Sequence, residues 1–139
     1  RELAPVASPT KLRVLISLER EPGRTSEILS AGPGSFVDEL LTRAGAIKLF
    51  DDAAGPFPKV GLEAVLGRDP DLIIELATEK NPERDQRLLS DWQAYPMLRA
   101  VSAGRLEVIS GTHTVVPGPR LMELYADLRR ALDRAGTVP

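Results

Sequence analysis

Short apolar runs alternate along this chain with stretches whose apolar residues recur at helical spacing. Runs of the first kind, typical of buried strands, lie at 12–17, 72–76 and 106–109, with a weaker one at 47–50. Helical spacing predicts helices over 35–44, 62–67, 81–92 and 118–132. A strand followed each time by a helix predicts an α/β fold. We expect a three-layer αβα sandwich with a mostly parallel sheet of about four strands.

Turn and capping residues mark where these helices begin and end. Ser35 is a suitable N-cap, and Asp38 follows it at capping-box spacing. Gly45 provides the stop for the same helix. Asn81 and Pro82 suit the N-cap and first position of a later helix. These local signals support the division into elements made from the apolar pattern.

The connections that follow the strands are the expected ligand side of the fold, because ligands of parallel sheets lie beyond the carboxyl ends of the strands. These connections are 18–34, 51–61, 77–81 and 110–118. The first has no clear periodicity, and a connection of that length is usually functional or disordered.

Composition excludes several classes of function and partner. The 139 residues fit one domain, and the net charge of -2 gives no sign of a nucleic-acid partner. Cysteine is absent, and no apolar run is long enough to span a membrane. With one histidine, no nucleophile-elbow motif and scattered acids, the chain is not expected to be an enzyme. A cytosolic α/β enzyme or regulatory domain that uses the same loops remains the alternative.

A few residues in these connections are candidates for ligand binding, and most of them have a structural or surface role as the alternative. Leu29 precedes a glycine-proline turn and belongs either to the core or to a ligand contact. Phe57, held extended between two prolines, suits stacking on a flat ligand but could also fill a gap under its loop. His113 can be an axial haem ligand or a surface histidine. Glu63 lies in a first helical turn, where the helix dipole stabilises a carboxylate.

Several of these segments, in this order, resemble the carboxy-terminal lobe of the substrate-binding proteins of ABC importers for vitamin B12, haem and iron-siderophores. The matching segments are Ala31-Gly32-Pro33-Gly34-Ser35-Phe36, Phe57-Pro58-Lys59-Val60, Asp69-Pro70-Asp71-Leu72-Ile73-Ile74, Trp92-Gln93-Ala94-Tyr95-Pro96, Ala100-Val101-Ser102-Ala103-Gly104-Arg105 and Pro117-Gly118-Pro119-Arg120. Together they cover most of the chain. The resemblance implies one half of a clamp whose two α/β lobes are joined by a long helix.

The resemblance also implies roles for single residues. Leu29 and Phe57 fall on ligand-contacting positions, and Thr112 and His113 lie in a loop whose polar residues face the ligand. Glu63 falls on the acid with which this lobe docks onto arginines of the permease. The vitamin B12-binding member has a tryptophan in place of Phe57, and its arginine near the last turn is absent here. Specific recognition of vitamin B12 is therefore not expected.

The same resemblance implies a domain organisation and a setting. We expect 1–10 to be a linker or the end of the interlobe helix, 11–135 the carboxy-terminal lobe, and 136–139 a tail. The expected partners are a ferric siderophore, haem or corrinoid, the ABC permease subunits and an amino-terminal lobe missing from this sequence. No cofactor is required. The expected location is periplasmic or extracytoplasmic, with a lipid anchor on the full-length protein left open.

Overall fold

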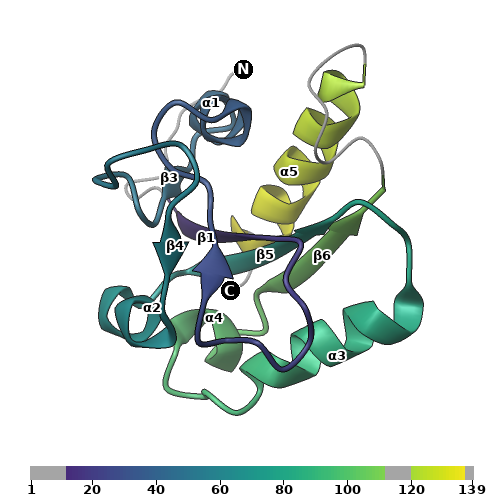
Figure 1. The fold of residues 1–139 in the computed structure, drawn as a ribbon. Helices are drawn as coiled ribbons and strands as arrows, with labels where there is room; N and C mark the ends of the chain where they lie inside the picture. The colour runs from purple at the N-terminus through teal and green to yellow at the C-terminus, as the bar shows by residue number, and fades with distance from the viewer. Residues whose placement is uncertain (1–11, 112–119, 137–139) are drawn as a thin grey trace.

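The computed structural model describes residues 12–111 and 120–136. Its elements follow one another as β1 (Arg13–Leu18), β2 (Ile28–Leu29), α1 (Phe36–Arg43), β3 (Ile47–Lys48), β4 (Lys59–Val60), α2 (Leu62–Arg68), β5 (Leu72–Ala77), α3 (Pro82–Trp92), α4 (Arg99–Ser102), β6 (Leu106–Ser110) and α5 (Leu121–Gly136). Figure 1 shows a sheet between two helical layers, α1 and α5 on one side and α2, α3 and α4 on the other. The predicted three-layer α/β sandwich is confirmed.

The main sheet has four strands in the order β3-β1-β5-β6, and every neighbouring pair is parallel. β1 and β5 pair over five residues, from Val14 opposite Leu72 to Leu18 opposite Leu76. Because β5 is buried along its whole length, it is the centre of the domain. The predicted parallel arrangement of the strands beginning near Leu12, Leu72 and Leu106 is confirmed.

Two apolar clusters cover the two faces of the sheet. Alternate strand residues point to opposite faces, so Val14 and Ile16 belong to the cluster under α1 and α5. Leu15 and Ile73 belong to the cluster formed with α2, α4 and the end of α3, where Trp92 is fully buried. The sheet is therefore covered on both faces, as its continuous apolar strands predict.

The predicted cap of α1 is present with one change. The Ser35 hydroxyl accepts a hydrogen bond from the Asp38 amide at 3.0 Å. The Asp38 carboxylate, however, accepts from the Gly34 amide at 3.1 Å, one residue before the position of a regular capping box. Gly45 follows the helix with a φ of +89°, the left-handed conformation that favours glycine at a helix end.

The structure adds a small second sheet that the apolar pattern did not indicate. β2 and β4 pair antiparallel, with Ile28 opposite Val60 and Leu29 opposite Lys59. Each strand is two residues long, too short to show a period. The long connection after β1 is therefore partly ordered by pairing with the connection before α2.

Candidate ligand-binding face

A two-stranded ribbon, made of residues 28–32 and 56–60, extends the β2–β4 pairing. The Ser30 amide donates to the Pro58 carbonyl at 2.9 Å, and the Gly32 amide donates to the Pro56 carbonyl at 2.8 Å. Both bonds keep the register of the β2–β4 pair. The two prolines have no amide hydrogen to return, so each pair is joined by a single bond. The two prolines nevertheless hold the backbone of this segment in an extended form.

The ribbon has one face that is mostly buried and one that is mostly exposed. Ile28 and Ser30 are buried, and both belong to hydrogen-bonded pairs of the ribbon. Leu29, Phe57 and Lys59 belong to the alternating pairs, and all three are exposed, whereas Ala31, opposite Phe57, is buried. Side chains of alternate residues in a strand share a face, and paired residues do too. We call Leu29, Phe57 and Lys59 the ribbon face.

The ribbon is attached to the main sheet where β3 stops. The Val14 carbonyl accepts from the Leu49 amide at 2.8 Å, just after the end of β3. Two residues further along β1, the Ile16 carbonyl points to the same side and accepts from the Ser30 hydroxyl at 2.7 Å. The buried serine thus replaces the missing strand partner, and it holds the ribbon beside the carboxyl-terminal half of β1.

Gly32 allows the two halves of the ribbon to approach closely. A Cβ atom at this position would lie 2.5 Å from the Gly55 carbonyl oxygen and 3.0 Å from Pro58 Cδ. Contacts that short require the backbone to move. The glycine of the glycine-proline turn is therefore needed for the approach of the ribbon strands.

A buried ionic network holds the beginning of the loop between β1 and β2. Arg20 Nε donates to Glu75 Oε2 at 2.8 Å, and its Nη1 donates to Asp91 Oδ2 at 2.8 Å. Trp92 Nε1 donates to the same Glu75 oxygen at 2.9 Å, and the Arg20 and Glu75 side chains are each 1% exposed. Asp91 also accepts from the Gly23 amide at 2.7 Å. The loop is therefore tied to β5 and α3.

The charge of Arg20 is maintained within this network. Burial opposes its charge, but the attraction of Glu75, the hydrogen bond to Glu75 and the contacts with Asp91 outweigh burial and raise the pKa of the guanidinium. Arg20 therefore remains protonated, as the buried carboxylate of Glu75 requires.

A second arginine anchors the loop that leads to Phe57. Arg68 of α2 donates two hydrogen bonds to the Asp52 carboxylate, at 2.8 and 3.1 Å, and one to the Leu49 carbonyl at 3.1 Å. Its guanidinium also lies 4.7 Å from the centre of the Phe50 ring. The hydrogen bond from Arg68 lowers the pKa of Asp52. An arginine thus anchors the loop before each ribbon strand: Arg20 anchors the loop before β2, and Arg68 anchors the loop before β4.

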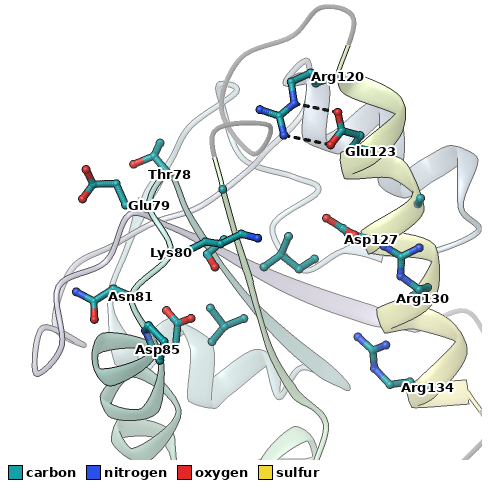
Figure 2. Close-up of a pocket in the computed structure, with 16 residues that line it drawn as sticks. Thr78, Glu79, Lys80, Asn81, Asp85, Arg120, Glu123, Asp127, Arg130 and Arg134 are labelled. Carbon is teal, nitrogen blue, oxygen red and sulfur yellow. Dashed lines mark hydrogen bonds and ion pairs between the residues drawn. The ribbon is translucent and has the colours of Figure 1, made fainter.

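The ribbon lies beside the carboxyl-terminal half of β1. At the same edge of the sheet, an open groove of about 1300 Å³ lies at the carboxyl ends of β5 and β6. Figure 2 shows Lys80 extending into it from the β5–α3 loop, toward α5. Arg120, just before α5, pairs with Glu123 at 2.9 Å, and on the helix Arg130 pairs with Asp127. Acids and bases are equally represented among the described residues lining the groove, four of each: Glu79, Asp85, Glu123 and Asp127, with Lys80, Arg120, Arg130 and Arg134. This part of the groove has no excess of either charge.

The structure places the predicted residues as follows. Leu29 and Phe57 lie together on the ribbon face and are 36% and 46% exposed, whereas Ile28, next to Leu29, is fully buried. Glu63 is exposed in the first turn of α2, just after the end of the ribbon and not on its face. Thr112 and His113 lie outside the described residues.

Sequence reasoning missed Lys59 and the Arg20 network. Glu75 was a usable signal, because a carboxylate inside an otherwise apolar strand needs a buried partner. No comparable signal marked Arg20 as that partner. The position of Lys59 on the ribbon face depends on the register of two short strands, which the sequence does not reveal.

Within 12–111 and 120–136, no group of three or more histidine and acidic residues is arranged to hold a metal ion. No helix in this part of the chain is long and apolar enough to cross a membrane.

No protein-family model matches the sequence, and no curated protein matches it significantly. Solved structures do match its fold. The Fe3+-hydroxamate transport protein of Saccharomonospora viridis superposes with a TM-score of 0.73 at 20% identity, over 87% of this chain and 41% of its own. The periplasmic vitamin B12-binding protein of Vibrio cholerae gives 0.74 at 22% identity, over 94% and 47%. A periplasmic haem-binding protein of Pseudomonas aeruginosa gives 0.71 at 26% identity, over 94% and 45%.

The fold is that of one lobe of a periplasmic substrate-binding protein. The chain spans a little under half the length of these structures, as a single lobe would. The resemblance based on sequence segments is thereby confirmed at the level of the fold. In such a lobe, the ribbon and the groove form the edge where the parallel strands end, which is the usual place for a ligand.

Proposed function

We propose that this chain is the carboxy-terminal ligand-binding lobe, residues 11–135, of an extracytoplasmic substrate-binding protein. The full protein would deliver a ferric siderophore, haem or corrinoid to an ABC importer. The lobe would cover one side of the ligand and a second lobe the other.

The ribbon face is the observation that carries this proposal. Leu29 and Phe57 are exposed apolar side chains on a backbone fixed by prolines, cross-strand hydrogen bonds and the buried Ser30. An exposed aromatic ring held on a rigid segment can bind a flat ligand without first losing conformational freedom. The structural neighbours are named for vitamin B12, haem and Fe3+-hydroxamate, and these names favour binding over catalysis.

The mechanism we infer has no covalent step. The ligand is captured between two lobes, the loaded protein docks on the permease through exposed acids, and the ligand is released there. Glu63 would supply the acid of this lobe. Capture by one lobe alone leaves half of the ligand surface in water, so the isolated chain should bind weakly.

The ligand is best identified by titrating this chain with haem, cobalamin and several ferric siderophores, using calorimetry at high protein concentration. We expect one ligand class to bind. Phe57→Ala should then weaken binding by about 1 kcal/mol, roughly five-fold, because the contact between ring and ligand is lost.

Met97→Ala is the matched control for this substitution. Met97 is a large apolar residue that is 65% exposed, in the turn before α4 and so near the amino ends of β5 and β6. The Met97→Ala substitution should leave ligand binding unchanged. Equal losses for the two variants, or no binding of any of these ligands, would contradict the proposed function.

Glu63→Ala should separate docking from binding in the full-length protein. Glu63 is exposed, so the free energy of unfolding should change by no more than about 0.5 kcal/mol. Ligand affinity should stay unchanged, while capture by the permease slows most at low salt, because exposed charges at an interface mainly steer association. Importer-dependent uptake and ligand binding are measured side by side.

Glu39→Ala provides the comparison, since Glu39 is also exposed in the first turn of a helix, α1. We expect uptake to remain normal in this variant. A Glu63 variant that loses ligand affinity but docks normally would assign the carboxylate to the ligand site instead.

A further inference from the structure

Lys59 is a cation without a carboxylate partner among the described residues, and it shares the ribbon face with the apolar side chains of Leu29 and Phe57. It is exposed, and it forms no ion pair with any residue that the structure describes. The other cations near the ribbon differ in this respect. Arg20 is buried against Glu75, and Arg68 is bound to Asp52.

The ribbon register fixes where this charge lies. Lys59 is opposite Leu29 in a pair whose Cβ atoms are about 5 Å apart in antiparallel sheets, and it is two residues from Phe57 on the same face. Its aliphatic stem can therefore lie along Leu29 while the ammonium group reaches the rim of the apolar surface.

One acid shares the ribbon face with Lys59. The ribbon register, continued by two residues, puts Glu27 opposite Gly61 and diagonal to Lys59, on the side away from Phe57. Both side chains are exposed, and they form no ion pair with each other. Along the ribbon face, Lys59 therefore lies between Glu27 and Phe57, and it is the charge next to the ring.

We propose that Lys59 is a specificity-determining residue, which selects a flat apolar ligand that carries a carboxylate at its rim. This inference rests on the proposed function and narrows it to one ligand class, a carboxylate-bearing tetrapyrrole of the haem type. The flat ring system would lie on Phe57 and Leu29, and a carboxylate would accept hydrogen bonds from the Lys59 ammonium group.

The groove is less suited to such a ligand. Among the described residues its lining has as many acids as bases, and its three arginines are engaged by carboxylates. Lys80 forms no ion pair with a described residue, but no exposed large apolar side chain in the described lining offers a flat ring system a surface beside it. Between closed lobes, an ammonium group without an anion would lose water without compensation. Neutral ligands such as a ferric hydroxamate, and corrinoids whose edge carries amides, would leave the Lys59 ammonium group desolvated and without an anion.

The test compares haem with haem dimethyl ester, in which both carboxylates are masked, as ligands for the 139-residue chain. Absorbance titrations at low and high salt measure the affinities of the native chain and of Lys59→Gln. We expect the substitution to weaken haem binding roughly three- to ten-fold at low salt, the effect of a partly screened charge pair, and to leave ester binding unchanged. High salt should reduce the difference, and Lys59→Arg should keep the preference for haem.

Arg43→Gln is the matched control, because Arg43 is an exposed cation in the last turn of α1, at the opposite edge of the sheet, where β3 begins. It should not alter the ratio of the two affinities. If Lys59→Gln weakens both ligands equally or neither, or if Arg43→Gln has the same effect, the inference is wrong while the proposed function stands. Binding of cobalamin or a neutral ferric hydroxamate in preference to haem overturns it as well. If no ligand binds at all, the proposed function fails and this inference fails with it.

Discussion

Replacing Arg20 with methionine should lower the free energy of unfolding by about 3–5 kcal/mol, the usual cost of removing one partner from a buried ion pair. The substitution leaves the Glu75 carboxylate 1% exposed and without its cation, bound only by the indole of Trp92. It also removes the bonds to Asp91 and to the Leu88 carbonyl, which weakens the attachment of the loop after β1 to α3, where the bond from the Gly23 amide to Asp91 remains. Denaturant unfolding followed by Trp92 fluorescence measures the loss.

Arg24→Met is the control in the same loop. Arg24 is 77% exposed, and the one ion pair it forms with a described residue, Glu21, is 3.9 Å long, so the change should stay within about 0.5 kcal/mol. The double variant Arg20→Met, Glu75→Leu should recover much of the lost stability, because it removes the isolated charge as well. Equal stability of the Arg20 and Arg24 variants would show that the buried network does not form.

Gly32→Ala should lower the free energy of unfolding by about 1–3 kcal/mol, the range for an overpacked site. The added methyl group would meet the Gly55 carbonyl oxygen at 2.5 Å, and a backbone atom cannot move away as a flexible side chain can. The ribbon strands must then separate, so ligand affinity should fall along with stability. Thermal unfolding and ligand titration of the same sample measure both effects.

Gly55→Ala tests the other side of this contact. A Cβ at Gly55 meets no atom within 4 Å, so this variant should fold and bind as the native chain does. A Gly32 variant with unchanged stability would mean that the ribbon strands do not approach as closely as described.

The main elements could be predicted because each depends on local signals. Apolar runs identified β1, β5 and β6, and burial on both faces explains why β1 and β5 lack alternation, whereas β6, at the end of the sheet, is mostly half-buried. Ser35 and Asn81 are N-caps, each accepting from the amide three residues later. Strand–helix alternation then left few arrangements other than a parallel sheet.

The site was less accessible to sequence reasoning because it depends on distant partners. The register that places Leu29 beside Lys59 joins residues 30 positions apart, through strands with no period of their own. Arg20 and Glu75 are 55 positions apart, and only the carboxylate inside an apolar strand hinted at the pair. Leu29 and Phe57 were candidates from the residues alone, which also allowed a place in the core, and the resemblance to a family implied that both contact the ligand.

The ion pair between Arg134 and Glu107 has a consequence for the behaviour of the chain among its own copies. β6 is the last strand of the sheet in the part of the chain that the structure describes, and one side of its backbone is not paired with another described strand. Arg134 of α5 binds the Glu107 carboxylate of this strand with two hydrogen bonds, at 2.7 and 2.8 Å. A charged pair held there disfavours the addition of a strand from another molecule. The domain should therefore resist aggregation through this edge of its sheet.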